Sequence, residues 1–486
     1  MYCVCKRPLF EIVTMNHSNP FFLLCLLCLT GCNDNQVPPQ TASLTTEENG
    51  NSEVEVSSAL VDYTLKLNDN AELEYRLHKK GVDPIPPEKG GGYYFSNYFD
   101  YCGEDELHLL SEVEGLRSFM MMAGNSFSPA GWKNIGQISG LETFMTQSSD
   151  ITDEHLIGLK GLLHLEDLQI IMLGSKGNPI SHQGLQVLAE LPALRRLVLH
   201  SRDLNPRACE LIGNCTQLRA LELRGSVTDE CLKPLGKLIN LRHLILHGTF
   251  SDAGLAYLGD LKYLERLVIH SDRLTGSGLH HFTNATELRE FGFSGTPQDN
   301  ASLKQLDQFP ALIILNLASP TVNDVLVMTM PRLPALEALS LRGSSITDAG
   351  LDFLVKVRNL TELDLKFTNI SNAGLTRLVP LQQLRLLLLR ESAEEDLITG
   401  KGLAPLTKLP QLEILDLDSI NSEILDFQPL AQINSLREVN LNFGTPDIYN
   451  RWLELLEQRP DLKKVEEFFP VSRRVGRFGF HTQEIP

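Results

Sequence analysis

The stretch "ALEALSLRGSSITDAGLDFL" spans residues 335–354, and its pattern returns in "NLTELDLKFTNISNAGLTRL" (359–378) and "NLRHLILHGTFSDAGLAYL" (240–258). Each copy contains L-x-x-L-x-L, a short polar stretch, and then an apolar residue followed by Ser or Thr, Asp or Asn, any residue, Gly and Leu. The L-x-L part alternates with a period of two, which predicts a short strand with its leucines pointing inward. The G-L-x-x-L part that follows has helical spacing. The chain is therefore built from repeated strand–helix units.

The pattern occurs fourteen times between residues 114 and 458, and eleven of the thirteen intervals between copies are 23 to 25 residues long. A single unit cannot bury its own leucines, so neighbouring units must stack and share one core. This predicts an α/β solenoid with a parallel β-sheet on the concave side and helices on the convex side. The copies resemble leucine-rich repeat proteins, in particular the ribonuclease-inhibitor-like and cysteine-containing types. The resemblance implies a horseshoe of about fourteen repeats that recognises partners.

The start of each predicted helix carries hydroxyl and carboxylate or amide side chains, as in Thr347-Asp348 and Ser371-Asn372. Such side chains can accept hydrogen bonds from the free N–H groups at a helix start. Gly350 and Gly374 follow two positions later. Glycine disfavours helix, so we expect these residues to allow close backbone packing.

Three cysteines within the repeats, Cys209, Cys215 and Cys231, occupy positions where other copies have Leu or Gly. We expect them to pack in the core as small apolar groups. A disulfide or a metal-binding role is the alternative.

The segment "FFLLCLLCLTGC" (21–32) is apolar from Phe21 to Leu29 and is followed by polar sequence. Nine residues span about 14 Å as a helix, about half of what a bilayer requires. The last four residues, ending at Cys32, resemble the lipobox of bacterial lipoproteins. The resemblance implies a signal peptide over 1–31, lipidation of Cys32, and a membrane-anchored protein of the bacterial cell envelope. A cleaved secretory signal without lipid, or an apolar start of a cytoplasmic protein, are the alternatives.

The other predicted boundaries follow from composition. Residues 32–58 are polar and hold little to bury, which predicts a disordered tether. Residues 59–113 and 459–486 do not fit the repeat, and we assign them to an N-terminal cap and a C-terminal tail around an array over 114–458.

Basic side chains gather on one part of the predicted concave face. The position after the second core leucine holds His200, Arg224, His247 and His270 in four adjacent copies, and a second row holds Arg196, His243 and Arg266. Adjacent strands lie about 4.8 Å apart, so these side chains are expected to form one basic, pH-sensitive cluster for an anionic or carboxylate-bearing partner. A solvated polar face, or a metal site at His247 and His270, are the alternatives. Glu222 is the carboxylate that this alignment places among them.

Acidic and apolar side chains gather on the concave face of later copies. Leu386, Leu388 and Ile414 lie among carboxylates, namely Glu362, Asp364, Asp416, Asp418 and Glu438. An apolar strip rimmed by charged residues is typical of a protein-binding surface. Two alternatives are that the basic segment 472–480 covers this strip, or that calcium binds to side chains of Asp416, Asp418, Asn440 and Asn442.

The charge and the motifs limit the possible functions. A formal net charge of −18 opposes binding to phosphate backbones, so no nucleic-acid partner is expected. The sequence contains no G-x-S-x-G, H-E-x-x-H or G-x-x-x-x-G-K motif. We therefore predict a non-catalytic binding protein without a cofactor, whose partner is a protein or, alternatively, a polysaccharide. A cytosolic adaptor and an enzyme with its site on the histidine-rich face are the rival interpretations.

Overall fold

The computed structural model describes residues 93–97, 104, 107–112, 115–121, 127–172, 180–202, 204–296, 303–389, 398–417, 427–441 and 446–464. All of these belong to one compact unit, Leu65–Pro486. The predicted signal peptide and tether, the basic segment 472–480, and the candidate residues Cys32, Asp418 and Asn442 lie outside the described residues.

One parallel sheet of sixteen strands runs through the described residues, and its strands follow one another in chain order. The strands are β1 (Tyr93–Asn97), β2 (Leu116–Met121), β3 (Thr143–Ser148), β4 (Asp167–Met172), β5 (Arg196–Ser201), β6 (Ala220–Val227), β7 (His243–Gly248), β8 (Arg266–His270), β9 (Glu290–Ser294), β10 (Ile314–Asn316), β11 (Ala338–Ser340), β12 (Glu362–Asp364), β13 (Leu386–Leu388), β14 (Ile414–Asp416), β15 (Glu438–Asn440) and β16 (Lys463–Lys464). The predicted α/β repeat solenoid is thereby confirmed. The sheet extends one strand beyond the fourteen repeats at each end, because β1 and β16 also pair with their neighbours.

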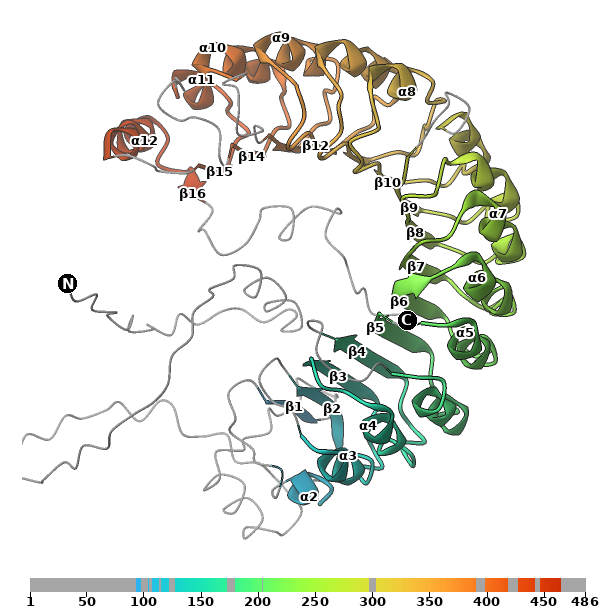
Figure 1. Cartoon of the computed structure of the whole chain (residues 1–486). Helices are drawn as coiled ribbons and strands as arrows, with labels where there is room; N and C mark the ends of the chain where they lie inside the picture. Colours follow the sequence, from blue (N-terminus) through green and yellow to red (C-terminus); the bar gives the residue numbers. More distant parts are fainter. Residues whose placement is uncertain are drawn as a thin grey trace, which may run out of the picture. The chain divides into compact units, whose positions relative to one another are not determined.

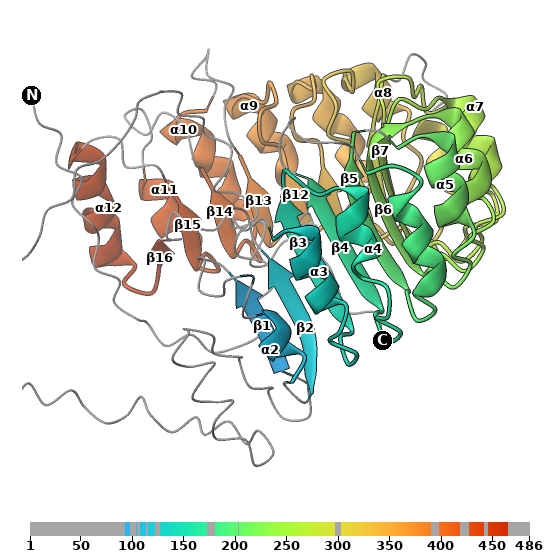
Figure 2. The same ribbon diagram turned by 60° about the horizontal axis from the view of Figure 1, so that its bottom comes forward.

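Short helices connect successive strands. The α-helices are α2 (Leu107–Leu110), α3 (Pro129–Ile135), α4 (Asp153–Ile157), α5 (Pro206–Gly213), α6 (Asp229–Leu235), α7 (Asp252–Leu255), α8 (Asp324–Met328), α9 (Asn372–Leu375), α10 (Gly400–Leu403), α11 (Gln428–Ala431) and α12 (Pro446–Gln458). The 3₁₀ helices are η3 (Gly184–Glu190), η4 (Ala256–Leu258), η5 (Ser277–Phe282), η6 (Leu303–Gln308), η7 (Asp348–Lys356), η8 (Thr376–Leu378) and η9 (Ala404–Lys408). Figure 1 shows the strands along the inner side of the curved array and the helices along its outer side, and Figure 2 shows the same two layers from another direction.

The core lies between the sheet and the helices and consists mainly of leucine. Leu339, Leu363 and Leu387 occupy the same register position in three adjacent strands, and each is fully buried. The period of two in each strand therefore separates a core face from a concave face, as predicted. Cys209, Cys215 and Cys231 are buried in this core, and none is in a disulfide in this structure, which confirms their expected packing.

Hydrogen bonds to carboxylate or amide side chains join neighbouring repeats along the convex side. Asp324 accepts a hydrogen bond from the backbone N–H of Thr347 at 2.7 Å and one from the Thr347 hydroxyl at 2.6 Å. The Thr347 hydroxyl in turn accepts from the N–H of Ala349, which confirms the predicted cap of its own helix. The inter-repeat contact recurs between Asp153 and Ser181, Asp229 and Ser251, Asp252 and Thr275, Asp348 and Ser371, and Asn372 and Thr399.

These inter-repeat contacts explain the glycine of the motif. A Cβ atom built on the glycine of the following repeat would lie less than 3.0 Å from an atom of the Asp or Asn, a distance that real Cβ atoms essentially never show. The six such pairs are Asp153 with Gly184, Asp229 with Gly254, Asp252 with Gly278, Asp324 with Gly350, Asp348 with Gly374, and Asn372 with Gly402. The expected close packing at these glycines is therefore confirmed, and the group that approaches belongs to the preceding repeat.

Some repeats have another residue in place of this glycine, and the preceding repeat explains them. Where the preceding repeat lacks Asp or Asn at this position, the glycine is replaced by a larger residue. The four described cases are His155 after Pro129, Ala208 after His182, Cys231 after Pro206, and Pro429 after Gly400. At five of the six pairs the nearest atom is a side-chain oxygen of the Asp or Asn, and at Gly278 it is the backbone oxygen of Asp252. The glycine is thus required by the residue of the neighbouring repeat and not by the conformation of its own backbone.

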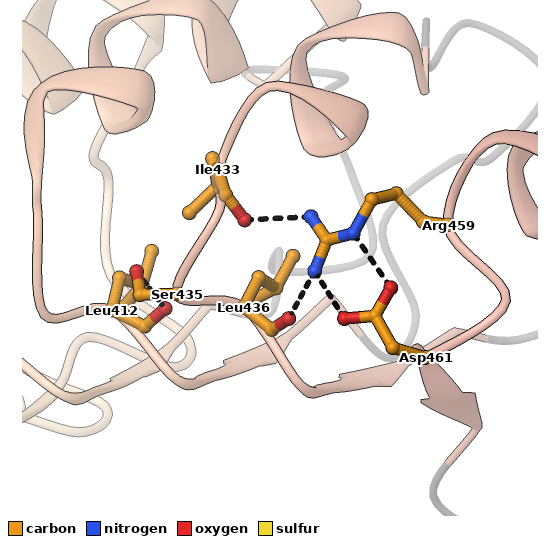
Figure 3. A network of polar contacts seen from close by, with 6 residues as sticks. All are labelled: Leu412, Ile433, Ser435, Leu436, Arg459 and Asp461. Atoms are coloured by element: carbon orange, nitrogen blue, oxygen red, sulfur yellow. Dashed lines mark hydrogen bonds and ion pairs between the residues drawn. The ribbon is translucent and has the colours of Figure 1, made fainter.

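Polar contacts also fasten the two ends of the array. At the N-terminal end, Glu104 accepts from the Ser128 N–H at 3.0 Å and from the Ser128 hydroxyl, and these bonds hold the pKa of Glu104 below its usual value. At the C-terminal end, the Arg459 guanidinium donates to the carbonyl oxygens of Ile433 at 2.8 Å and Leu436 at 2.6 Å, and it pairs with Asp461 (Figure 3). Each contact links a terminal segment to the adjacent repeat.

Candidate functional site

The predicted basic side chains lie side by side on the concave face. Parallel pairing aligns His200, Arg224, His247 and His270 across β5 to β8. The same register places Arg196 beside Ala220, followed by His243 and Arg266. The sequence therefore predicted both rows correctly. We call these seven residues, Arg196, His200, Arg224, His243, His247, Arg266 and His270, the histidine–arginine face.

Each arginine of the histidine–arginine face has a carboxylate partner. Arg196 lies 3.8 Å from Asp167, and the Nε atom of Arg266 lies 3.0 Å from Glu290. Glu222 binds two residues, with its Oε1 atom 2.7 Å from the Arg224 Nε atom and 2.9 Å from the His200 Nε2 atom. The prediction that Glu222 is the one ladder carboxylate was therefore wrong, because Asp167 and Glu290 occupy the same row one repeat beyond each end. The face is charge-paired rather than basic.

The carboxylates of this face differ in their affinity for protons. Burial acts to raise the pKa of Glu222, but the hydrogen bonds and charges of His200 and Arg224 outweigh it and lower the pKa to about 2. For Asp167 and Glu290 burial outweighs the neighbouring arginine, and their pKa values are raised. Glu222 therefore stays ionised at neutral pH and holds the two side chains on either side of it.

The histidines at the centre of this face resist protonation. Burial, followed by the charges of Arg224 and His270, lowers the pKa of His247 to about 4. Burial and Arg266 likewise lower the pKa of His243. The rings of His247 and His270 stack with their centroids 5.0 Å apart and their planes 26° apart. The buried Nε2 atom of His247 has no hydrogen-bond partner among the described residues. At neutral pH, His247 therefore presents a neutral ring with an unused polar atom.

The acidic and apolar region differs from its sequence-based description. Leu386, Leu388 and Ile414 form a small cluster of their own on the concave side, separate from the main core. Asp416 and Asp364 beside them are buried, with 0% and 3% of their surface exposed. Glu362 is also buried, with 7% exposed, and Glu438 is half-buried. The strip is therefore buried in this structure, while Asp418 lies outside the described residues.

A lysine that the sequence analysis missed neutralises this region. The Lys366 Nζ atom lies 2.5 Å from Asp416 Oδ2, and Asn440 donates to Asp416 Oδ1 at 3.1 Å. The backbone N–H of Lys366 donates to Asp364, whose pKa burial nevertheless raises. One oxygen of Asp416 thus accepts a hydrogen bond and the other pairs with the lysine ammonium, so a calcium ion at this carboxylate would have to displace Lys366. The row that contains His200 and His270 continues to Lys366, so extending that row would have revealed it.

The described residues contain no group of three or more His, Cys, Asp or Glu that could hold a metal ion. Within the same residues, no helix combines the length and apolar character needed to cross a bilayer.

The repeats, the parallel concave sheet and the convex helices define a leucine-rich repeat fold. No protein-family model and no curated protein matches the chain. Among solved structures, an internalin (inlF) from Listeria monocytogenes is similar, with 20% identity, a TM-score of 0.44, and coverage of 71% of this chain and 90% of the internalin.

Two further solved structures are similar in fold. One is the leucine-rich repeat ectodomain of the Arabidopsis thaliana receptor kinase GASSHO1/SCHENGEN3, with 15% identity, a TM-score of 0.39 and 77% of this chain covered. The other is TLR13 in a complex with ssRNA13, with 16% identity, a TM-score of 0.34 and 70% of this chain covered. This chain spans 49% and 45% of their lengths. These likenesses concern the kind of fold alone.

Proposed function

We propose that this chain is a non-catalytic binding protein whose histidine–arginine face recognises a protein partner. The observation that carries the proposal is the charge-paired network of β4 to β9, in which Glu222 holds His200 and Arg224 while Asp167 and Glu290 hold the outer arginines. Side chains fixed in this way lose little conformational freedom on binding. Adjacent strands of one sheet keep them at fixed spacing. This part of the concave face therefore offers a pre-organised polar surface.

The chemistry of the face favours recognition by hydrogen bonds rather than by net charge. The arginines are paired with carboxylates, and His247 is neutral at physiological pH. A partner that presents backbone amides, hydroxyls or carboxylates matches these groups. A protein surface offers all three, whereas a polysaccharide offers mainly hydroxyls.

Substitutions on the two sides of the same repeats test the proposal. Arg224→Ala and His270→Ala alter the concave face, and Arg207→Ala and His280→Ala are matched controls on exposed positions of α5 and η5. The purified chain would be immobilised and exposed to envelope extracts, and the retained protein identified and its affinity measured. We expect the concave pair to weaken binding at least tenfold and the convex pair to leave it unchanged. Equal effects from both pairs would place the site elsewhere, and retention of glycan instead of protein would assign the face to a polysaccharide.

An enzyme with its site on the same face is the rival proposal. The stacked rings of His247 and His270 are the groups that it would use. It requires turnover of a substrate that disappears in His247→Ala while binding remains. The binding proposal expects the opposite result, a loss of affinity without any turnover to lose.

We further propose that the chain is a lipoprotein of a bacterial cell envelope, anchored through Cys32. The support is the sequence of residues 21–32, where an apolar run ends in Leu-Thr-Gly-Cys. Two or three acyl chains give stable anchoring, whereas one gives marginal binding. Intact masses and membrane fractions of the wild type and Cys32→Ala would test it. Loss of residues 1–31, added acyl mass and membrane association in the wild type alone are the expected results. If both proteins stay full length and soluble, the cytosolic adaptor becomes the better interpretation.

A further inference from the structure

Two buried cysteines meet at a position where the inter-repeat carboxylate contact is missing. Pro206 occupies the position at which six other repeats have Asp or Asn. Cys231 occupies the position of the following repeat that is glycine when that Asp or Asn is present. The Cys231 Sγ atom donates to the carbonyl oxygen of Leu204 at 3.5 Å. His155, which follows Pro129, makes the equivalent contact to Phe127 at 3.0 Å. At these two interfaces a polar side chain takes over the link between repeats, whereas the side chains of Ala208 and Pro429 at the other two have no donor.

Cys231 and Cys209 are neighbours across this interface. Cys209 lies in α5 and Cys231 in α6, two helices that pack against each other. Both side chains are fully buried. At the equivalent positions of a later interface, a Cβ atom built on Gly278, which matches Cys231, would lie 2.9 Å from the Cδ1 atom of Leu255, which matches Cys209. Cys215, the third cysteine of these repeats, lies after the end of α5 and instead donates to the carbonyl oxygen of Leu211 in that helix. Cys209 and Cys231 are therefore the two thiols placed to react together.

We propose that Cys209 and Cys231 form a disulfide that joins α5 to α6 when the chain meets a disulfide oxidant. In the first step the Cys231 thiolate attacks one sulfur of the oxidant, for example oxidised glutathione, and one glutathione thiolate leaves. Cys209 then loses its proton and displaces the second glutathione thiolate from Cys231. One S–S bond forms, the two cysteines lose two electrons and two protons, and the oxidant is reduced to two thiols. A disulfide requires the sulfur atoms to approach to about 2.05 Å.

The surroundings of the two thiols assign their roles. Hydrogen bonding, first from Cys209 and then from Thr228, lowers the pKa of Cys231 to about 6, while the bond to Cys231 and burial raise that of Cys209. The thiolate is the attacking species in thiol–disulfide exchange. Cys231 therefore attacks first and Cys209 resolves. Because both are buried, the exchange takes place while the chain folds or when α6 opens locally.

Peptide mapping of the full chain, refolded with oxidised glutathione, tests the proposal. Cleavage after Lys and Arg, except before Pro, places Cys209 and Cys215 together in residues 208–219, and Cys231 in residues 225–237. We expect these two peptides to be linked, with a mass two hydrogens below their sum, in the wild type and in Cys215→Ala. Cys209→Ala should abolish the link. The thermal midpoint of the oxidised chain should exceed that of the reduced chain. In Cys231→Gly, which cannot form the disulfide, the oxidised and reduced chains should have the same thermal midpoint.

Two results would overturn the proposal. One is a linked pair of peptides that survives in Cys209→Ala and vanishes in Cys215→Ala, which would assign the bond to Cys215. The other is unlinked peptides from refolded, oxidised chain whose cysteines are all recovered as separate thiols or glutathione adducts. Neither result bears on the histidine–arginine face, which lies on the other side of the sheet, so this test is independent of the proposed binding function.

Discussion

Removing the carboxylate of Asp324 tests the reason for the glycine in each repeat. Asp324→Ala deletes the acceptor of two hydrogen bonds, from the Thr347 N–H at 2.7 Å and from its hydroxyl at 2.6 Å. A hydrogen bond to a charged group contributes about 1.5–3 kcal/mol when desolvated. Thr347 is exposed, so water replaces part of this. We expect unfolding to require about 2 kcal/mol less for the variant than for the wild type, an estimate that scales the hydrogen-bond contribution for solvent access.

Another repeat of this chain has Asn at the position of Asp324, which indicates the effect of Asp324→Asn. Asn372 accepts from the Thr399 N–H at 2.9 Å and donates to its hydroxyl at 2.8 Å, so an amide can replace the carboxylate. Asp324→Asn should therefore cost less than about 1 kcal/mol, because both hydrogen bonds remain. Asp352→Ala is the matched control. Its carboxylate lies in η7 and pairs with Arg377 at the surface, and exposed pairs contribute about 0–1 kcal/mol.

A double-mutant cycle connects the carboxylate to the glycine. The three atoms nearest to a Cβ built at Gly350 all belong to Asp324. Gly350→Ala should destabilise the wild type by about 1–3 kcal/mol through overpacking, and it should cost at least about 1 kcal/mol less in the Asp324→Ala background. Urea unfolding followed by circular dichroism measures the total, and amide exchange at Thr347 locates it in one repeat interface. Strictly additive effects of the two substitutions would refute the explanation of the glycine.

Three further predictions concern groups that the structure places in unusual surroundings. Native His247 has a pKa of about 4, below the ~6.5 of an unperturbed histidine. The unfolded chain therefore binds a proton at this histidine at a higher pH than the native chain does. The stability that the histidine contributes above about pH 6.5 is lost as the pH falls toward 4. The urea midpoints at pH 7 and pH 5 should differ more in the wild type than in His247→Gln. Lys366→Met leaves the Asp416 carboxylate buried without its ammonium group, which should cost about 3–5 kcal/mol in urea unfolding, whereas adding Asp416→Leu should recover most of it. Arg459→Ala removes the donors to two carbonyl oxygens, so amide exchange should accelerate in β16 and α12 but not in α5, and Arg459→Lys should not restore it, because an ammonium lacks the planar fork of donors.

The order of the side chains along the candidate site could be predicted from strand register. Because the repeats have nearly constant length and their strands are parallel, the sequence alone places His200, Arg224, His247 and His270 beside one another. Asp167 and Glu290 lie in the strands next to Arg196 and Arg266, just outside the predicted cluster, and their pairing with these arginines makes the face charge-paired rather than basic. Lys366 follows β12, whereas its partner Asp416 ends β14, so this ion pair across two repeats does not follow from the register of adjacent strands.

The class of fold follows from the sequence alone. Its period of about 24 residues, the L-x-L alternation and the helical G-L-x-x-L spacing dictate strand–helix units that can bury their leucines only by stacking. The tertiary structure decided what each repeat does to the next. The Asp of one copy and the Gly of the following copy are 26 residues apart at Asp324 and Gly350, and neither residue reveals its partner when it is read within a single copy. Hydrogen bonding, burial and the resulting pKa values depend on which atoms meet across an interface, and that is determined when the repeats pack against one another.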